Sequence, residues 1–141
     1  MATIRREVSL NVPAANAWDA LRDVGALHTR LCPGFVTDVK VETDANQKIT
    51  ARQVTFGNGM TARELIVTVD DAEKRLVWSV VGGRMTHHNA SAQVFDAGPA
   101  RCRFVWVADL LPDELEPAIA KMIEAGLAAV SRTLKGDRGG G

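Results

Sequence analysis

The stretch that decides the fold lies near the C-terminus, where residues 104–134 read FVWVADLLPDELEPAIAKMIEAGLAAVSRTL. Its first half is an apolar run typical of a strand, and Pro112 ends it because proline has no N–H to donate to a ladder. Its second half repeats apolar residues at intervals of three and four, which predicts an amphipathic helix of about 18–20 residues, or roughly 30 Å. This helix needs an apolar surface to cover.

The chain upstream of this stretch predicts that surface. Residues 35–111 read as six strands in an antiparallel meander. Turn signals separate the strands at Asp44–Asn46, Asn58–Gly59, Asp70–Lys74, Gly82–Gly83 and Asp96–Pro99. With a tight two-residue turn at Asn58–Gly59, Val54 faces Arg63, and the apolar residues of neighbouring strands fall on one face.

The N-terminal segment adds one strand and two short helices. Val8, Leu10 and Val12 alternate with polar residues, as in a half-buried strand, and Pro13 follows them. Residues 14–22 and 26–31 then predict two short helices. The expected architecture is α+β: a curved seven-stranded antiparallel sheet wrapped around the long C-terminal helix, with the two short helices between strands 1 and 2.

Composition narrows the classes of partner. Seventeen basic and seventeen acidic side chains cancel, which argues against nucleic acid as the main partner. No apolar run approaches the roughly 20 residues that cross a membrane, and MATIRREVSL lacks the apolar core of a signal peptide. We therefore expect no membrane insertion and a cytoplasmic protein. We expect one domain over residues 1–136, a flexible tail over 137–141, and a monomer or homodimer.

The cysteine and histidine residues predict neither a metal nor a cofactor site. Cys32 and Cys102 are far apart, and in a cytoplasmic chain they read as reduced, buried residues. No metal-binding triad, phosphate loop or nucleophile elbow is present in the sequence.

Several segments resemble the SRPBCC or START-like helix-grip superfamily, and in particular its bacterial polyketide cyclase/dehydrase-like members. The resemblance covers residues 3–135. It is carried by Ser9–Ala14, Ala17–Leu21, Leu31–Phe35, Arg63–Glu64, His87–Ser91 and Phe104–Pro112. The superfamily includes carriers, receptors, cyclases and hydrolases, so the resemblance implies the fold and a pocket more strongly than an activity.

The resemblance implies that a ligand site lies between the sheet and the long helix. Carried over residue by residue, its apolar walls are Val54, Phe56, Leu65, Val67, Trp78, Ala90, Ala92, Phe104, Trp106, Met122, Ile123, Gly126 and Val130. The alternative is that these residues fill a solid core. Small residues such as Ala90, Ala92, Ala108 and Gly126 favour an open space, although close packing of helix on sheet also explains Gly126.

Four polar residues are candidates for specific roles. The tight-turn register places Arg52 and Arg63 on the inner face, where an anionic ligand group is a suitable partner; a one-residue bulge or an edge location would instead place both in water. Glu64 then points away from the pocket. His88 shares a face with Ala90 and is a candidate general acid or base, or simply a buried histidine bonded to a carbonyl or to Asp109.

Three functions are compatible with this sequence. The first is binding of an apolar or amphipathic small molecule, such as a lipid, an aromatic compound or a polyketide. The second is a cyclase, dehydrase or isomerase in which Arg63 orients the substrate and His88 or Glu64 moves a proton. The third is a partner-binding domain with a filled core. His28, on the second short helix, lies near the pocket entrance implied by the resemblance and is more often a surface residue.

Overall fold

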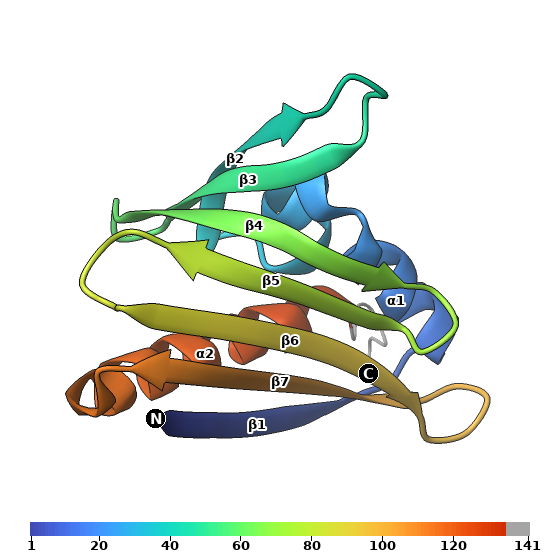
Figure 1. The fold of residues 1–141 in the computed structure, drawn as a ribbon. Coiled ribbons are helices and arrows are strands. Elements are labelled where there is room, and N and C mark those ends of the chain that lie inside the picture. The colour runs from blue at the N-terminus through green and yellow to red at the C-terminus, as the bar shows by residue number, and fades with distance from the viewer. Residues whose placement is uncertain (135–141) are drawn as a thin grey trace.

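The computed structural model describes residues 1–134, and the tail predicted for 137–141 lies outside them. Seven strands form one antiparallel sheet in the order β1-β7-β6-β5-β4-β3-β2. Their bounds are β1 Ala2–Leu10, β2 Val36–Thr43, β3 Ile49–Phe56, β4 Thr61–Asp70, β5 Arg75–Val81, β6 His87–Asp96 and β7 Cys102–Leu111. The sheet curves, and the helices lie on its concave side (Figure 1). The predicted helix-grip architecture is confirmed.

The long helix α2, Glu116–Leu134, has 19 residues and follows a single 3-10 turn, η3 Asp113–Leu115. Its buried side is formed by Ala120, Ile123, Gly126, Leu127, Ala129 and Val130. This pattern is the spacing of three and four that the sequence shows. The helix therefore covers the part of the sheet made by β1, β7 and β6 (Figure 1).

Helix α1, Ala14–Arg22, coincides with the predicted segment. The second predicted helix is instead two short turns, a 3-10 turn η1 at Val24–Ala26 and a π-helical turn η2 at Leu27–Leu31. Trp18 on α1 donates its indole N–H to Asp71 at 2.9 Å. This bond ties α1 to the β4–β5 turn.

The prediction of a two-residue turn at Asn58–Gly59 is wrong, because the loop is one residue longer. Phe56 N–H donates to the carbonyl of Met60 at 2.8 Å, so the loop has three residues, Gly57 to Gly59. Gly57 N–H also donates to the carbonyl of Phe35 at 2.9 Å, and a Cβ on Gly57 would collide with the Gly34 carbonyl. The close approach of this loop to the start of β2 thus sets the hairpin register.

The one-residue change reverses the faces of two charged residues on β4. Val54 pairs with Ala62, Arg52 with Glu64, and Gln53 with Arg63. Successive side chains of a strand point to opposite faces. Glu64 therefore joins Arg52 on the inner face, whereas Arg63, predicted to point inward, lies on the outer face.

A bulge at Val67 keeps β4 in phase with β5. Val69 pairs with Leu76, but the register shifts between Ile66 and Thr68, so that Ile66 faces Trp78. Val67 is left 56% exposed, and Leu65 pairs with Ala51 and Ser79 on the outer face. The prediction that Leu65 and Val67 point into the pocket is therefore wrong.

The pairing of β6 with β7 keeps the apolar residues of the two strands on one face, as expected. Ala92 pairs with Trp106, and Ala90 pairs with Ala108. The two alanines also pair with Leu76 and Trp78 of β5. Each of these alanines is therefore paired with a tryptophan on a neighbouring strand, Ala90 with Trp78 and Ala92 with Trp106.

Candidate functional site

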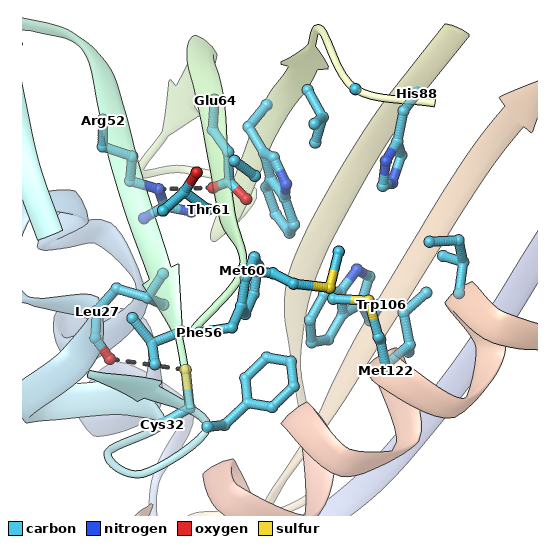
Figure 2. Close-up of a pocket in the computed structure, with 18 of the residues that line it drawn as sticks. Leu27, Cys32, Arg52, Phe56, Met60, Thr61, Glu64, His88, Trp106 and Met122 are labelled. Atoms are coloured by element: carbon cyan, nitrogen blue, oxygen red, sulfur yellow. Dashed lines mark hydrogen bonds and ion pairs between the residues drawn. The ribbon is translucent and has the colours of Figure 1, made fainter. Parts of the chain in front are cut away.

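A cavity of about 470 Å³ lies between the concave face of the sheet, the turn η2 and the inner side of α2. Most of its wall is apolar. Figure 2 shows its interior, with residues from β3 and β4 on one side and residues from β6, β7 and α2 on the other. A space of this size accommodates a small organic molecule.

The cavity opens between two loops and the start of α2. Asn58 and Met60 come from the β3–β4 loop, Gly82 to Arg84 from the β5–β6 loop, and Ala118 from α2. All of these lining residues are solvent-exposed, and Met60 is 59% exposed. Both loops lie on the left of Figure 1, at the same end of the sheet as the first turn of α2.

Aromatic rings form two edge-to-face pairs around the cavity. The ring centroids of Trp78 and Trp106 are 5.8 Å apart with an interplanar angle of 64°, and those of Phe35 and Phe56 are 5.4 Å apart at 68°. All four residues line the cavity. Such pairs prefer this geometry, and they present flat apolar surfaces to whatever occupies the space.

The expectation that small residues keep the cavity open holds only in part. Ala92 lines the cavity, but Ala90 and Ala108 are covered and do not. A Cβ on Gly126 would lie 2.7 Å from the Trp106 ring and 3.1 Å from Phe35. Gly126 therefore allows close packing of α2 on the sheet, and the alanines make room for the two tryptophans.

The buried polar centre of the site is the ion pair of Arg52 and Glu64. Arg52 Nε donates to Glu64 Oε1 at 2.8 Å, and the two side chains are 3% and 8% exposed. Arg52 Nη1 also donates to the carbonyl of Val24 at 3.0 Å, and its guanidinium lies 5.7 Å from the centre of the Trp78 ring. The partner of the inner arginine is thus supplied by the protein itself.

Arg63 has its own partner outside the cavity. Its Nε and Nη2 each donate to Glu42 at 2.8 Å, with side-chain exposures of 43% and 46%. Glu42 raises the pKa of the Arg63 guanidinium chiefly through the hydrogen bond, and Arg63 in turn lowers the pKa of the Glu42 carboxyl through the same bond. The predicted inward role for Arg63 is therefore wrong.

His88 extends from β6 into the cavity (Figure 2). Burial lowers its imidazole pKa from 6.5, and the neighbouring His87 lowers it further. His88 Nδ1 is buried and has no hydrogen-bond partner within the described chain. Asp109, considered above as its partner, instead accepts a hydrogen bond from Thr3 at 2.5 Å.

Trp106 Nε1 is a second buried polar atom on the wall that has no partner among residues 1–134. His28 Nδ1 is also buried without a hydrogen-bond partner in this part of the chain, but His28 does not line the cavity. An indole N–H can only donate, so Trp106 presents an unused donor. The interior of the cavity therefore combines one neutralised ion pair with two unpaired nitrogens.

The structure brings most of the predicted site residues to the cavity. Those that line it are Arg52, Phe56, Glu64, Trp78, His88, Ala92, Phe104, Trp106, Met122, Ile123 and Val130. Those that do not are Val54, Arg63, Leu65, Val67, Ala90 and Gly126. Val54 points inward but is fully covered.

Sequence reasoning missed the part of the wall contributed by loops and short turns, which includes Leu27, Leu31, Cys32, Phe35, Met60, Met85 and Leu115. On these irregular segments no period links a residue to the inner face. It also missed Val80 on β5 and Ile119 on α2, which were recognisable from the strand alternation and from the helical spacing that identified Met122.

The fold and the enclosed site define a helix-grip protein. The sequence matches the family model described as polyketide cyclase/dehydrase and lipid transport over residues 1–135, and the chain belongs to this family. No curated protein matches the sequence. No helix within residues 1–134 has the length and apolar character needed to cross a membrane.

Solved structures with this fold come from several bacteria. A protein from Thermobifida fusca is 30% identical with a TM-score of 0.75, and the match covers 93% of this chain and 91% of that one. The ZhuI aromatase/cyclase from Streptomyces sp. R1128 is 18% identical, with a TM-score of 0.72 and coverages of 92% and 90%. A START superfamily protein from Mycobacterium smegmatis is 13% identical, with a TM-score of 0.72 and coverages of 95% and 94%.

Proposed function

We propose that this protein binds an apolar or amphipathic small molecule in the cavity between the sheet and α2. The observation that carries the proposal is the cavity of about 470 Å³, which is lined by aromatic and aliphatic side chains and opens to solvent at one end. A solid core would leave no such space. The family description, with its reference to lipid transport, supports the same function.

The unpaired nitrogens on the wall also support a binding site. Buried polar groups in proteins are nearly always hydrogen-bonded, because an unmade bond is destabilising. His88 Nδ1 and Trp106 Nε1 lack partners in the described chain and belong to residues of one cavity. A ligand in the cavity is a natural source of those partners.

Direct detection of a bound molecule tests this proposal. The protein is purified from cytoplasmic expression and examined by native mass spectrometry, and then screened by thermal shift against fatty acids, aromatic acids and aromatic polyketides. We expect one class to raise the melting temperature. If no class binds or stabilises the protein, the proposal fails.

A matched pair of variants on α2 tests whether the ligand binds in the cavity. Ala118 lines the opening, whereas Ala125 is exposed on the same helix away from it. We expect Ala118→Phe to narrow the opening and weaken binding of the ligand found in the screen. Ala125→Phe adds the same ring outside the cavity and is expected to leave binding unchanged.

A second candidate function is an enzyme of the cyclase or dehydrase kind that uses the same cavity. The observation that favours it is the position of His88, whose lowered pKa leaves the imidazole neutral near pH 7 and able to accept a proton. The test is turnover of aromatic polyketide substrates by the wild-type protein and by His88→Gln. Activity that survives the substitution would remove His88 from this role.

A further inference from the structure

The polar groups of the cavity indicate which kind of small molecule it binds, an inference that rests on the proposed function. Trp106 lines the cavity, and its Nε1 is buried and has no acceptor among the described residues. The indole N–H has no lone pair and cannot change its role, so the missing partner must be an acceptor. A carbonyl, ether or phenolic oxygen meets this requirement, and a pure hydrocarbon does not.

The electrostatics of the interior disfavour an anion. Arg52 is the buried cation of the described wall, and its Nε and Nη1 already donate to Glu64 and to the carbonyl of Val24. An anionic ligand that approaches Arg52 would meet the Glu64 carboxylate in a low-dielectric site, where like charges repel strongly. Arg84 also lines the cavity, but it is exposed at the opening, where water screens its charge.

The shape of the wall favours flat rings. Trp78, Trp106, Phe35 and Phe56 form two edge-to-face pairs around the space. Met60, Met85 and Met122 complete the wall with unbranched, polarisable side chains, which adjust to an occupant and make favourable contacts with aromatic rings. Figure 2 shows Met60 and Met122 around the same part of the cavity as Trp106. Trp106 Nε1 is shielded from solvent, so a ligand that bonds to it has to displace the side chains that cover it.

We infer that the cavity takes an uncharged, largely aromatic molecule that carries a carbonyl or equivalent oxygen, and that Trp106 Nε1–H donates a hydrogen bond to this oxygen. The neutral Arg52–Glu64 pair then selects against a carboxylate at the same depth. Trp106 is the specificity-determining residue of the site. The surrounding methionines adapt to the ring system.

Three naphthalene probes of similar size test the inference. 2-Acetylnaphthalene carries the carbonyl, 2-isopropenylnaphthalene replaces that oxygen with a CH2 group, and 2-naphthoate carries a negative charge. Dissociation constants are measured by calorimetry or fluorescence for the wild-type protein and for Trp106→Phe. The ratio between variants isolates the hydrogen bond, because the hydration of each probe is the same in every measurement.

We expect Trp106→Phe to weaken binding of the ketone about tenfold and to change binding of the alkene less than about twofold. We also expect 2-naphthoate to bind more weakly than the ketone at pH 7.5. Trp18→Phe is the matched control, since it too loses an indole hydrogen bond, the one to Asp71, but lies outside the cavity. It should leave the affinities of all three probes unchanged.

Two results would overturn the inference while leaving the proposed function intact. One is an equal loss of ketone and alkene affinity in Trp106→Phe, which would make the indole a purely apolar surface. The other is tighter binding of 2-naphthoate than of the ketone. Failure of all three probes to bind the wild-type protein would overturn the inference and count against the proposed function as well.

Discussion

Two ion pairs on opposite faces of the sheet show how burial changes the energetic effect of the same pair of side chains. Arg52–Glu64 is almost fully buried, whereas Arg63–Glu42 is roughly half exposed on the other face of the sheet. Both have bonds of 2.8 Å. Only the buried pair leaves an uncompensated charge in a low-dielectric place when one partner is removed.

We therefore predict that Glu64→Ala lowers the free energy of unfolding by about 3–5 kcal/mol. Glu42→Ala, its matched control on the outer face, should change it far less, because water solvates the arginine left behind. Urea unfolding of the two variants gives the comparison. Equal losses would show that Arg52 gains water in the folded protein.

His88 makes stability depend on pH in a defined direction. Burial lowers its pKa in the folded state below the ordinary value of 6.5, so the unfolded chain binds the proton more readily. Stability is therefore lost as the pH falls below about 6.5, by at most about 1.4 kcal/mol per pH unit for one proton.

His88→Gln lacks this titrating group. We therefore expect its free energy of unfolding to fall less steeply with decreasing pH than that of the wild type, in the range from pH 6.5 down to the lowered pKa of His88. Chemical unfolding at a series of pH values measures the slope. An NMR titration of the wild-type imidazole provides an independent check. A His88 midpoint at or above 6.5 would contradict the prediction.

At the scale of elements, the contact between α2 and the sheet depends on the absence of one side chain. Alanine normally stabilises a helix relative to glycine by about 1 kcal/mol. At Gly126, however, a Cβ would lie 2.7 Å from the Trp106 ring. The helix would have to move outward or the indole would have to shift.

Gly126→Ala is thus predicted to destabilise the protein by about 1–3 kcal/mol in spite of its better helix propensity. Ala125→Gly, at the next and exposed position, should cost no more than about 1 kcal/mol through propensity alone. Thermal and urea unfolding distinguish the two effects. A higher melting temperature for Gly126→Ala would show that the helix–sheet contact yields easily.

The strands, the turns and α2 were predictable because their signals are local. Alternation identifies strands, glycine and asparagine mark turns, and the spacing of three and four identifies the helix. The register of β3 with β4 was not predictable in this way. It depends on Gly57 meeting the Gly34 carbonyl, which is a contact between segments distant in sequence. The bulge at Val67, which sets the register of β4 with β5, has no local signal either.

The error propagated to the site because side chains alternate along a strand. A shift of one residue placed Glu64, and not Arg63, on the inner face. The site therefore contains a neutral ion pair where unpaired cations were expected. The loop contributions of Phe35, Met60 and Met85 have no periodic signal at all. The helix-grip class was thus easier to predict than the polarity of its cavity.

At the scale of the whole molecule, the cavity links ligand binding to stability. A molecule that binds only the folded state stabilises it in proportion to the logarithm of its concentration, by about 2.7 kcal/mol at 100 times its dissociation constant. For a chain of this size we expect a rise in melting temperature of about 5–10 °C. Ala118→Phe should reduce this shift and Ala125→Phe should not.

Cys32 gives this molecule a built-in reporter of whether the cavity is filled. Its thiol forms part of the wall, donates weakly to the carbonyl of Leu27 at 3.6 Å, and has its pKa raised by burial to about 12. Cys102, the other cysteine, lies away from the cavity and can be replaced by alanine. In Cys102→Ala a small disulfide reagent should label Cys32 slowly at pH 8, and more slowly still when a guest fills the cavity and covers the sulfur.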